Sequence, residues 1–98
     1  MPHRSALLDL LARRSARRGQ FTLASGRQST LYIDARLTTM SPEGMTLIGP
    51  LGLGVIRSSG WRVQSIGGLT LGADPMTYAI TYASAIAARE SLEQNEAP

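Results

Sequence analysis

The sequence contains no cysteine and no lysine among its 98 residues. Without cysteine the chain can form no disulfide, no thiolate zinc site and no cysteine nucleophile. Without lysine it can form neither a Schiff base nor a Walker-type phosphate loop. Its one histidine, His3, has no second histidine beside it for a triad or a metal site. These absences exclude several classes of covalent, hydrolytic and metal chemistry.

Long apolar runs are also absent. No run reaches the roughly 18 residues that a membrane-spanning helix needs. The N-terminus lacks the apolar core and cleavage site of a secretory signal. We therefore expect no membrane partner and a cytoplasmic location. Hydrophobic residues make up 43% of the chain and charged residues 17%, which is typical of one small globular domain.

Positive charge is concentrated in the first third of the chain. The net charge is +3, and all ten basic residues are arginines, seven of which lie in residues 1–36. The arginines at 13–18 could contact nucleic acid or another anion. The alternative is a solvated helix end, where cations favour the helix dipole. Because the aromatic residues do not alternate with these arginines, we expect no nucleic-acid partner.

The first third predicts a helix followed by a hairpin. A leucine-rich face, a cap at Ser5 and a stop at Gly19 predict a helix over 5–18. Two β-rich runs at 21–23 and 30–34 flank a Ser-Gly turn and predict a β-hairpin.

The remainder predicts two helices around a strand. Ser41 and Pro42 are typical of a helix start, although interior glycines and Pro50 predict that this helix is kinked or weak. Residues 61–66 are predicted to form a strand, and Asp74-Pro75 is typical of the start of another helix. The polar tail at 91–98 is expected to fray.

Two constellations could carry chemistry. Residues 63–76 read as a strand, a glycine turn and a helix start. Such a junction would direct backbone N–H groups toward one point, where they could bind a phosphate group. The alternative is a turn with a purely structural role. Tyr32, Asp34 and Arg36 alternate, so on a strand they would project to one side. They could bind a small planar acid, or they could be a solvent-facing side with an ion pair.

Three motifs together resemble orotate phosphoribosyltransferase, specifically its N-terminal part. They are Phe21-Thr-Leu-Ala-Ser-Gly-Arg27, Ser29-Thr-Leu-Tyr-Ile-Asp-Ala-Arg36 and Gly67-Gly-Leu-Thr-Leu-Gly-Ala-Asp-Pro75. The resemblance implies an α/β chain with an incomplete type I phosphoribosyltransferase fold. An N-terminal helix and β-hairpin would form a hood, followed by the first strand and helices of a parallel-sheet core.

The resemblance also implies an activity. The family transfers phosphoribosyl from phosphoribosyl pyrophosphate to orotate, giving orotidine 5'-phosphate and pyrophosphate in pyrimidine biosynthesis. Mg²⁺ would arrive with the phosphoribosyl donor, and family members are homodimers. Orotate and the donor are therefore the expected partners.

The resemblance assigns roles by position. The orotate ring would lie at Tyr32, Ile33, Asp34 and Arg36. The pyrophosphate loop would be Thr70, Leu71, Gly72, Ala73 and Asp74, which is the junction that the residues themselves indicate as an anion site. The hood turn would be Ser25, Gly26 and Arg27.

The family pattern continues into a mobile loop and a ribose-phosphate loop that this sequence does not contain. We therefore predict one partial domain over 1–98, with a hood at about 5–40, the start of the core at 41–90 and a frayed tail at 91–98. We expect these residues to bind no metal of their own and to be inactive alone. The alternative hypothesis is a small basic binding protein without catalysis.

Overall fold

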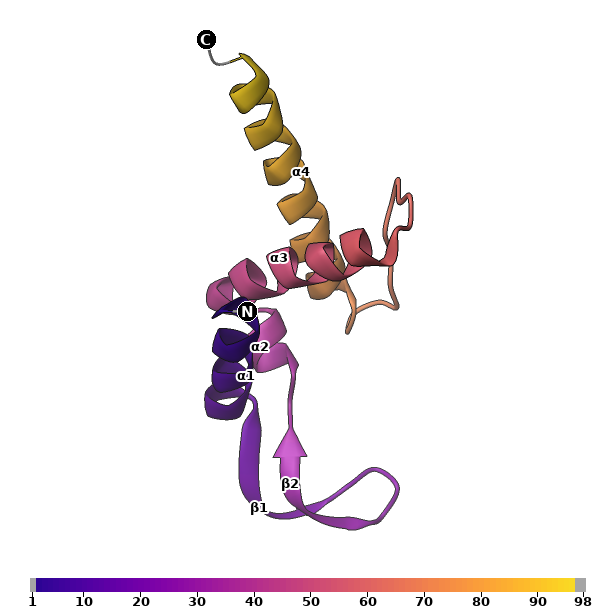
Figure 1. Ribbon diagram of the computed structural model, residues 1–98. Coiled ribbons are helices and arrows are strands. Elements are labelled where there is room, and N and C mark those ends of the chain that lie inside the picture. Colours follow the sequence, from indigo (N-terminus) through magenta and orange to yellow (C-terminus); the bar gives the residue numbers. More distant parts are fainter. Residues whose placement is uncertain (1, 97–98) are drawn as a thin grey trace.

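The computed structural model describes residues 2–96. Its elements in chain order are α1 (Pro2–Arg14), β1 (Ala16–Thr22), β2 (Gln28–Ile33), α2 (Arg36–Thr39), α3 (Pro42–Ser59) and α4 (Asp74–Glu96). In Figure 1 the hairpin lies at one end, α3 crosses the middle, and α4 projects away at the other end. The molecule measures 61 × 25 × 22 Å, and its radius of gyration of 16.8 Å exceeds the roughly 13 Å of a compact chain of this length.

The first helix lies closer to the N-terminus than the sequence predicts: it begins at Pro2, so the predicted cap at Ser5 is wrong and Ser5 lies inside the helix. The prediction of a helix over 5–18 is wrong at its C-terminal end, because α1 ends at Arg14. Arg17 and Arg18 instead belong to β1 and pair with residues of β2. Gly19, the expected helix stop, lies inside β1 at an irregularity of register. Pairing with a distant strand therefore overrides the local preference for helix.

The predicted β-hairpin is confirmed, with longer strands than expected. β1 and β2 pair antiparallel and form a two-stranded sheet. The Leu23 amide donates to the Arg27 carbonyl at 2.9 Å, and the Gly26 amide donates to the Leu23 carbonyl at 2.8 Å. Gly26 has a φ of 86°, a left-handed conformation that glycine adopts without steric cost.

The predicted start of α3 is also confirmed. The Ser41 hydroxyl accepts a hydrogen bond from the Gly44 amide at 3.0 Å, and proline occupies the first helical turn. The helix ends at Gly60, which has a φ of 77°. Pro50 lies inside α3, yet the helix continues on both sides of it, from Pro42 to Ser59.

The interior glycines of α3 have a packing role. α4 crosses α3 where Gly49 and Gly52 lie. A Cβ atom at Gly49 would lie 2.6 Å from the Ala79 carbonyl oxygen, and one at Gly52 would lie 2.5 Å from the Ile80 side chain. The glycines that weaken α3 as an isolated helix therefore let the two helices approach closely.

One prediction for the second half needs correction. The strand predicted at 61–66 does not form; this segment is a loop. A strand needs a neighbour, and the one sheet among residues 2–96 is the hairpin. α4 begins at Asp74, at the predicted Asp74-Pro75 start, and extends to Glu96. The fraying expected of the tail at 91–98 stays a prediction. Residues 97–98 lie outside the described part.

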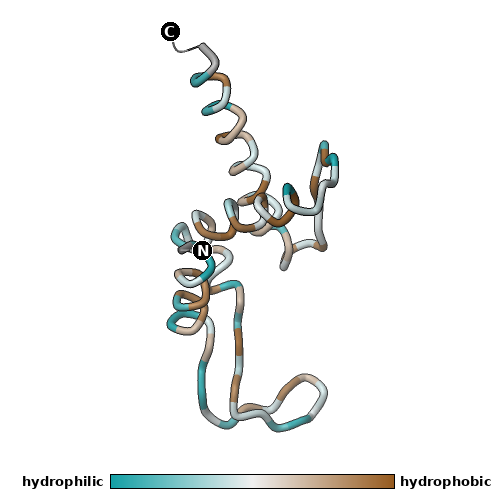
Figure 2. Tube along the Cα trace, viewed as in Figure 1, coloured by the Kyte–Doolittle hydropathy of each residue, from teal (hydrophilic) through white to brown (hydrophobic). Residues whose placement is uncertain are grey.

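The apolar core is small. Its buried members are Leu10, Ile48 and Ala79. Large apolar side chains stay exposed, led by Leu69 at 86% and Trp61 at 72%, and Figure 2 shows apolar residues along the hairpin and both long helices. No helix within residues 2–96 has the length and apolarity to cross a membrane. The described residues thus leave much of their own apolar surface uncovered.

Candidate functional site

A hollow of about 480 Å³ lies at the base of the hairpin. Its lining comes from the α1–β1 junction, both strands and α2: Ser15, Arg17, Gln20, Phe21, Thr22, Tyr32, Asp34 and Leu37. Two of the residues predicted to hold orotate, Tyr32 and Asp34, are among them. The structure therefore brings part of the predicted set together in one concave place.

Strand pairing positions the walls of this hollow. Arg17 lies directly opposite Tyr32 in the β1–β2 register. Directly opposed residues in an antiparallel pair project to the same face, so both side chains reach the hollow. The rings of Phe21 and Tyr32 lie with their centroids 5.4 Å apart and tilted by 33°. They form an aromatic wall of the hollow, which Arg17 also lines.

A buried hydrogen bond anchors the floor. The hydroxyls of Ser15 and Thr38 lie 2.6 Å apart, and both residues are buried. The Asp34 amide donates to the Ser15 carbonyl at 2.9 Å, which extends the strand pairing by one residue. Because buried polar groups must find partners, this contact fixes α2 against the α1–β1 junction.

Ile33 and Arg36 lie outside this hollow. Ile33 pairs with Ala16 and is 58% exposed, and successive strand residues point to opposite faces. Arg36 belongs to α2, so the expectation that Tyr32, Asp34 and Arg36 alternate on one strand is wrong. The helix nevertheless turns Arg36 back toward Asp34, and their side chains form an ion pair at 3.2 Å.

The Arg36 guanidinium hydrogen-bonds the Asp34 carboxylate and holds the pKa of that carboxyl below its ordinary value of 3.8. The Arg36 amide bonds the same oxygen at 3.2 Å, and the positive charge of Arg17 acts in the same direction. Asp34 is therefore ionised at neutral pH, with its charge largely matched by Arg36.

Replacing Arg36 should raise the pKa of Asp34 toward its ordinary value. We expect Arg36→Gln to shift the Asp34 titration upward in carboxyl-detected NMR. In the native chain the interaction favours the folded state above the ordinary pKa of 3.8, and this stabilisation is lost as the pH falls through the lower folded pKa. Arg13→Gln is the matched control, because it removes the same charge from a different ion pair, the one with Asp9. This variant should leave the pKa of Asp34 unchanged. Equal titrations in the native chain and in Arg36→Gln would contradict the assignment.

The predicted pyrophosphate loop, Thr70 to Asp74, lies elsewhere, at the start of α4. The Ala73 amide donates to the Leu69 carbonyl at 2.9 Å, and the Asp74 amide donates to the Leu71 carbonyl at 3.1 Å. The two backbone amides nearest the start of α4 thus already donate hydrogen bonds to carbonyls within the turn. The loop contributes no lining to the hollow at the hairpin base.

The predicted hood turn forms the tip of the hairpin. The Arg27 amide lies 3.4 Å from the Ser25 hydroxyl, which accepts its hydrogen bond, and Gly26 supplies the left-handed residue of the turn. Figure 1 shows this turn at the end of the molecule away from α4. The three groups of residues singled out from the sequence therefore occupy three separate places.

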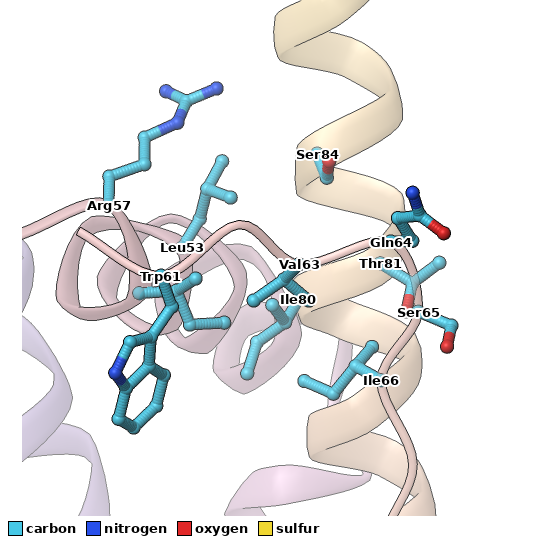
Figure 3. A pocket seen from close by; sticks show the side chains of 11 residues that line it. Leu53, Arg57, Trp61, Val63, Gln64, Ser65, Ile66, Ile80, Thr81 and Ser84 are labelled. Carbon is cyan, nitrogen blue, oxygen red and sulfur yellow. The ribbon is translucent and has the colours of Figure 1, made fainter. Parts of the chain in front are cut away.

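A second hollow, of about 390 Å³, lies where the 61–66 loop passes over the crossing of α3 and α4. In Figure 3, Val63 and Ile66 of this loop lie close to Ile80 of α4, with Trp61 at one side. The sequence did not indicate this hollow. Its lining combines apolar side chains with the polar residues Arg57, Gln64, Ser65, Thr81 and Ser84.

Residues 2–96 contain no group of three His, Cys, Asp or Glu that could hold a metal ion. The one acidic side chain of the hairpin hollow, Asp34, is already paired with Arg36. The donor set thus does not fit a Mg²⁺ site built by the protein.

Arg17 and Phe21 were not predicted from the sequence as members of the hairpin hollow. Regular pairing extended outward from the Ser-Gly turn would place Arg18 opposite Tyr32. The register irregularity between Arg18 and Phe21 brings Arg17 there instead, and no signal in the sequence indicated that irregularity.

No protein-family profile matches the chain, but curated proteins do. An orotate phosphoribosyltransferase from Bradyrhizobium is 43% identical over 81 residues, which cover 83% of this chain and 43% of that protein. The orotate phosphoribosyltransferase of Mycobacterium tuberculosis is 40% identical over 82 residues, which cover 84% of this chain and 45% of that protein. The chain therefore spans less than half the length of these curated relatives.

The chain is also similar to solved structures of phosphoribosyltransferases. The crystal structure of the Mycobacterium tuberculosis orotate phosphoribosyltransferase in complex with Fe(III) dicitrate matches with a TM-score of 0.75 at 40% identity, covering 81% of this chain and 46% of that one. A phosphoribosyltransferase from Corynebacterium diphtheriae matches with a TM-score of 0.69 at 27% identity, covering 83% and 44%. The resemblance inferred from the three motifs is confirmed, and so is the incomplete type I phosphoribosyltransferase fold.

Proposed function

We propose that this chain, similar over four fifths of its length to orotate phosphoribosyltransferases, supplies part of such an enzyme. The complete activity joins orotate to phosphoribosyl pyrophosphate and releases pyrophosphate. The observation that carries the proposal is the identity of 40% together with a TM-score of 0.75 to a solved enzyme of that name. Because the donor is a phosphorylated sugar, we place the activity in the cytoplasm.

In the proposed reaction the C–O bond at the anomeric carbon of the donor breaks, and an orotate ring nitrogen takes its place. Catalysis must position that nitrogen and stabilise the departing pyrophosphate. Tyr32 would hold the orotate ring against the aromatic wall at the hairpin base. Residues 70–74 would face the pyrophosphate end. We propose no protein-built metal site, since Mg²⁺ would enter with the donor phosphates.

We further propose that residues 1–98 are inactive alone. Several large apolar side chains of the 61–73 loop and of α4 are exposed, among them Trp61, Leu71 and Tyr82. Side chains of this size normally lie against other protein. The matched enzymes are more than twice as long as the matched region, so the part of such an enzyme outside that region would supply the cover.

A chimera tests the proposal. Residues 5–88 of this sequence would replace the matched segment in the Mycobacterium tuberculosis orotate phosphoribosyltransferase. We expect the purified chimera to form orotidine 5'-phosphate from orotate, phosphoribosyl pyrophosphate and Mg²⁺, and the isolated chain to form none. A folded chimera without activity would contradict the proposed function, whereas product formation by the isolated chain would contradict its inactivity.

The role of Tyr32 is tested in the same chimera. Tyr32→Ala removes half of the aromatic wall, and we expect the KM for orotate to rise about tenfold or more, since base–aromatic stacking contributes roughly 1–3 kcal/mol. Tyr32→Phe keeps the ring and serves as the matched control, with a KM close to that of the chimera. If Tyr32→Ala leaves this KM unchanged, the orotate ring does not rest on Tyr32.

A further inference from the structure

The loop that follows α3 has a backbone without partners. Within residues 2–96, the N–H and C=O groups of residues 62–68 form no hydrogen bond with other backbone groups. Such groups either remain in water or pair with another strand, because an unpaired backbone group costs free energy when it is buried. The composition favours pairing, since Trp61, Val63 and Ile66 belong to the aromatic and β-branched classes that are enriched in strands. The loop thus has the composition of a strand and lacks a neighbour.

Apolar contacts hold this loop against the two long helices. In Figure 3, Val63 and Ile66 lie close to Ile80 of α4, where α3 and α4 cross. Other apolar surface beside the loop stays uncovered, because Trp61 is 72% exposed and Val63 is 47% exposed. A backbone edge that rests on helices and is flanked by exposed apolar side chains is suited to receive a strand from another chain.

The lengths of the matched relatives indicate the occupant of this edge. The matched region makes up 43% of the Bradyrhizobium enzyme and 45% of the Mycobacterium tuberculosis enzyme. More than half of each relative therefore lies outside that region. Within residues 2–96, β1 and β2 pair only with each other and offer no strand to this loop. A neighbouring strand carried by the rest of such an enzyme would account for both observations.

We propose that residues 62–66 are a docking edge for a separate polypeptide, the remaining part of an orotate phosphoribosyltransferase chain, and become a strand when it pairs with them. This inference rests on the proposed function, because it takes the occupant from the same family. It adds that noncovalent contacts at this edge suffice, so that the enzyme assembles from two chains. Main-chain hydrogen bonds and the burial of apolar side chains would both stabilise the contact.

The experiment co-expresses residues 1–98 with the part of the Mycobacterium tuberculosis enzyme that follows the matched segment, with an affinity tag on the latter. We expect the two chains to purify together and to form orotidine 5'-phosphate, whereas neither chain alone forms it. In hydrogen exchange, the amides of residues 62–66 should exchange about a hundredfold more slowly in the complex than in the isolated chain. If the tagged chain is insoluble, the two chains are refolded together from urea, and failure to form a complex then counts against the inference.

Proline substitutions test the edge itself. Gln64→Pro and Ser65→Pro remove amides that would point to opposite edges of an extended strand, and neither amide donates a backbone hydrogen bond in the isolated chain. At least one of them should lower the yield of complex about tenfold or more. Ala24→Pro is the matched control, because Ala24 is exposed in the hairpin turn and its amide also donates no backbone hydrogen bond. This control should leave the yield unchanged. Circular dichroism checks that each variant folds, and the hydrogen exchange of the unsubstituted chain tests the edge without any variant.

Several outcomes would overturn the inference. An active contiguous chimera, together with two separate chains that neither associate nor complement each other, would do so while the proposed function stands. A complex in which residues 62–66 exchange as fast as in the isolated chain, or which neither proline weakens, would place the contact elsewhere. Protection of residues 62–66 in the concentrated isolated chain would make a second copy the occupant. If the folded contiguous chimera is itself inactive, the proposed function fails and this inference fails with it.

Discussion

Gly44→Ala should destabilise the chain strongly. Gly44 lies in the first turn of α3, and an added Cβ would collide with the Thr38 carbonyl and lie 2.9 Å from the Ser41 hydroxyl. That carbonyl also accepts hydrogen bonds from the amide and the hydroxyl of Ser41. We expect a loss of about 1–3 kcal/mol from overpacking, and up to about 2 kcal/mol more where the cap breaks. Urea unfolding followed by circular dichroism measures it.

Gly54→Ala is the matched control for this prediction. Gly54 lies in the same helix, and a Cβ there would meet nothing within 4 Å. Alanine is favoured over glycine in a helix interior by about 1 kcal/mol, so this substitution should stabilise the chain. Two glycines of one helix would thus respond with opposite signs. Equal responses would show that the α2–α3 contact does not form as described.

Leu10→Ala should have the largest effect of any truncation in α1. Leu10 is 2% exposed and is the largest fully buried apolar side chain of the described residues. Replacing a buried leucine by alanine costs about 2–5 kcal/mol. Because so few apolar residues are buried, we expect this variant to be largely unfolded at room temperature, as judged by loss of the cooperative urea transition.

Leu8→Ala is the control for that prediction. Leu8 lies in the same helix but is 69% exposed, so its truncation should change stability by no more than about 0.5 kcal/mol. Similar losses in the two variants would mean that α1 does not bury its Leu10 face.

Features that depend on neighbouring residues were predictable from the sequence. The turn at Ser25 and Gly26 forms because a glycine is available where the backbone takes a positive φ. The start of α3 follows from the side chain of Ser41 reaching an amide three residues ahead. The motifs that indicated the family are also contiguous segments, which explains why the similar proteins agree with them.

Features that depend on distant residues were not predictable in this way. The boundary between α1 and β1 moves to Ser15 because β1 gains backbone hydrogen bonds from β2, which outweigh the helix preference of 13–18. The segment 61–66 has strand-like composition, yet it stays a loop where no neighbouring strand pairs with it. Composition alone does not supply a pairing partner.

The sequence by itself thus determined the hairpin turn, the start of α3 and the family resemblance. Only the tertiary structure decided which side chains share a hollow. Arg17 lies opposite Tyr32 and lines the same hollow, whereas Ile33 projects to the other face of the hairpin. Arg36 belongs to α2, and its side chain forms an ion pair with Asp34. The physical reason is that turns and caps form from bonds spanning a few residues, whereas a binding surface forms from strands and helices that meet across the chain.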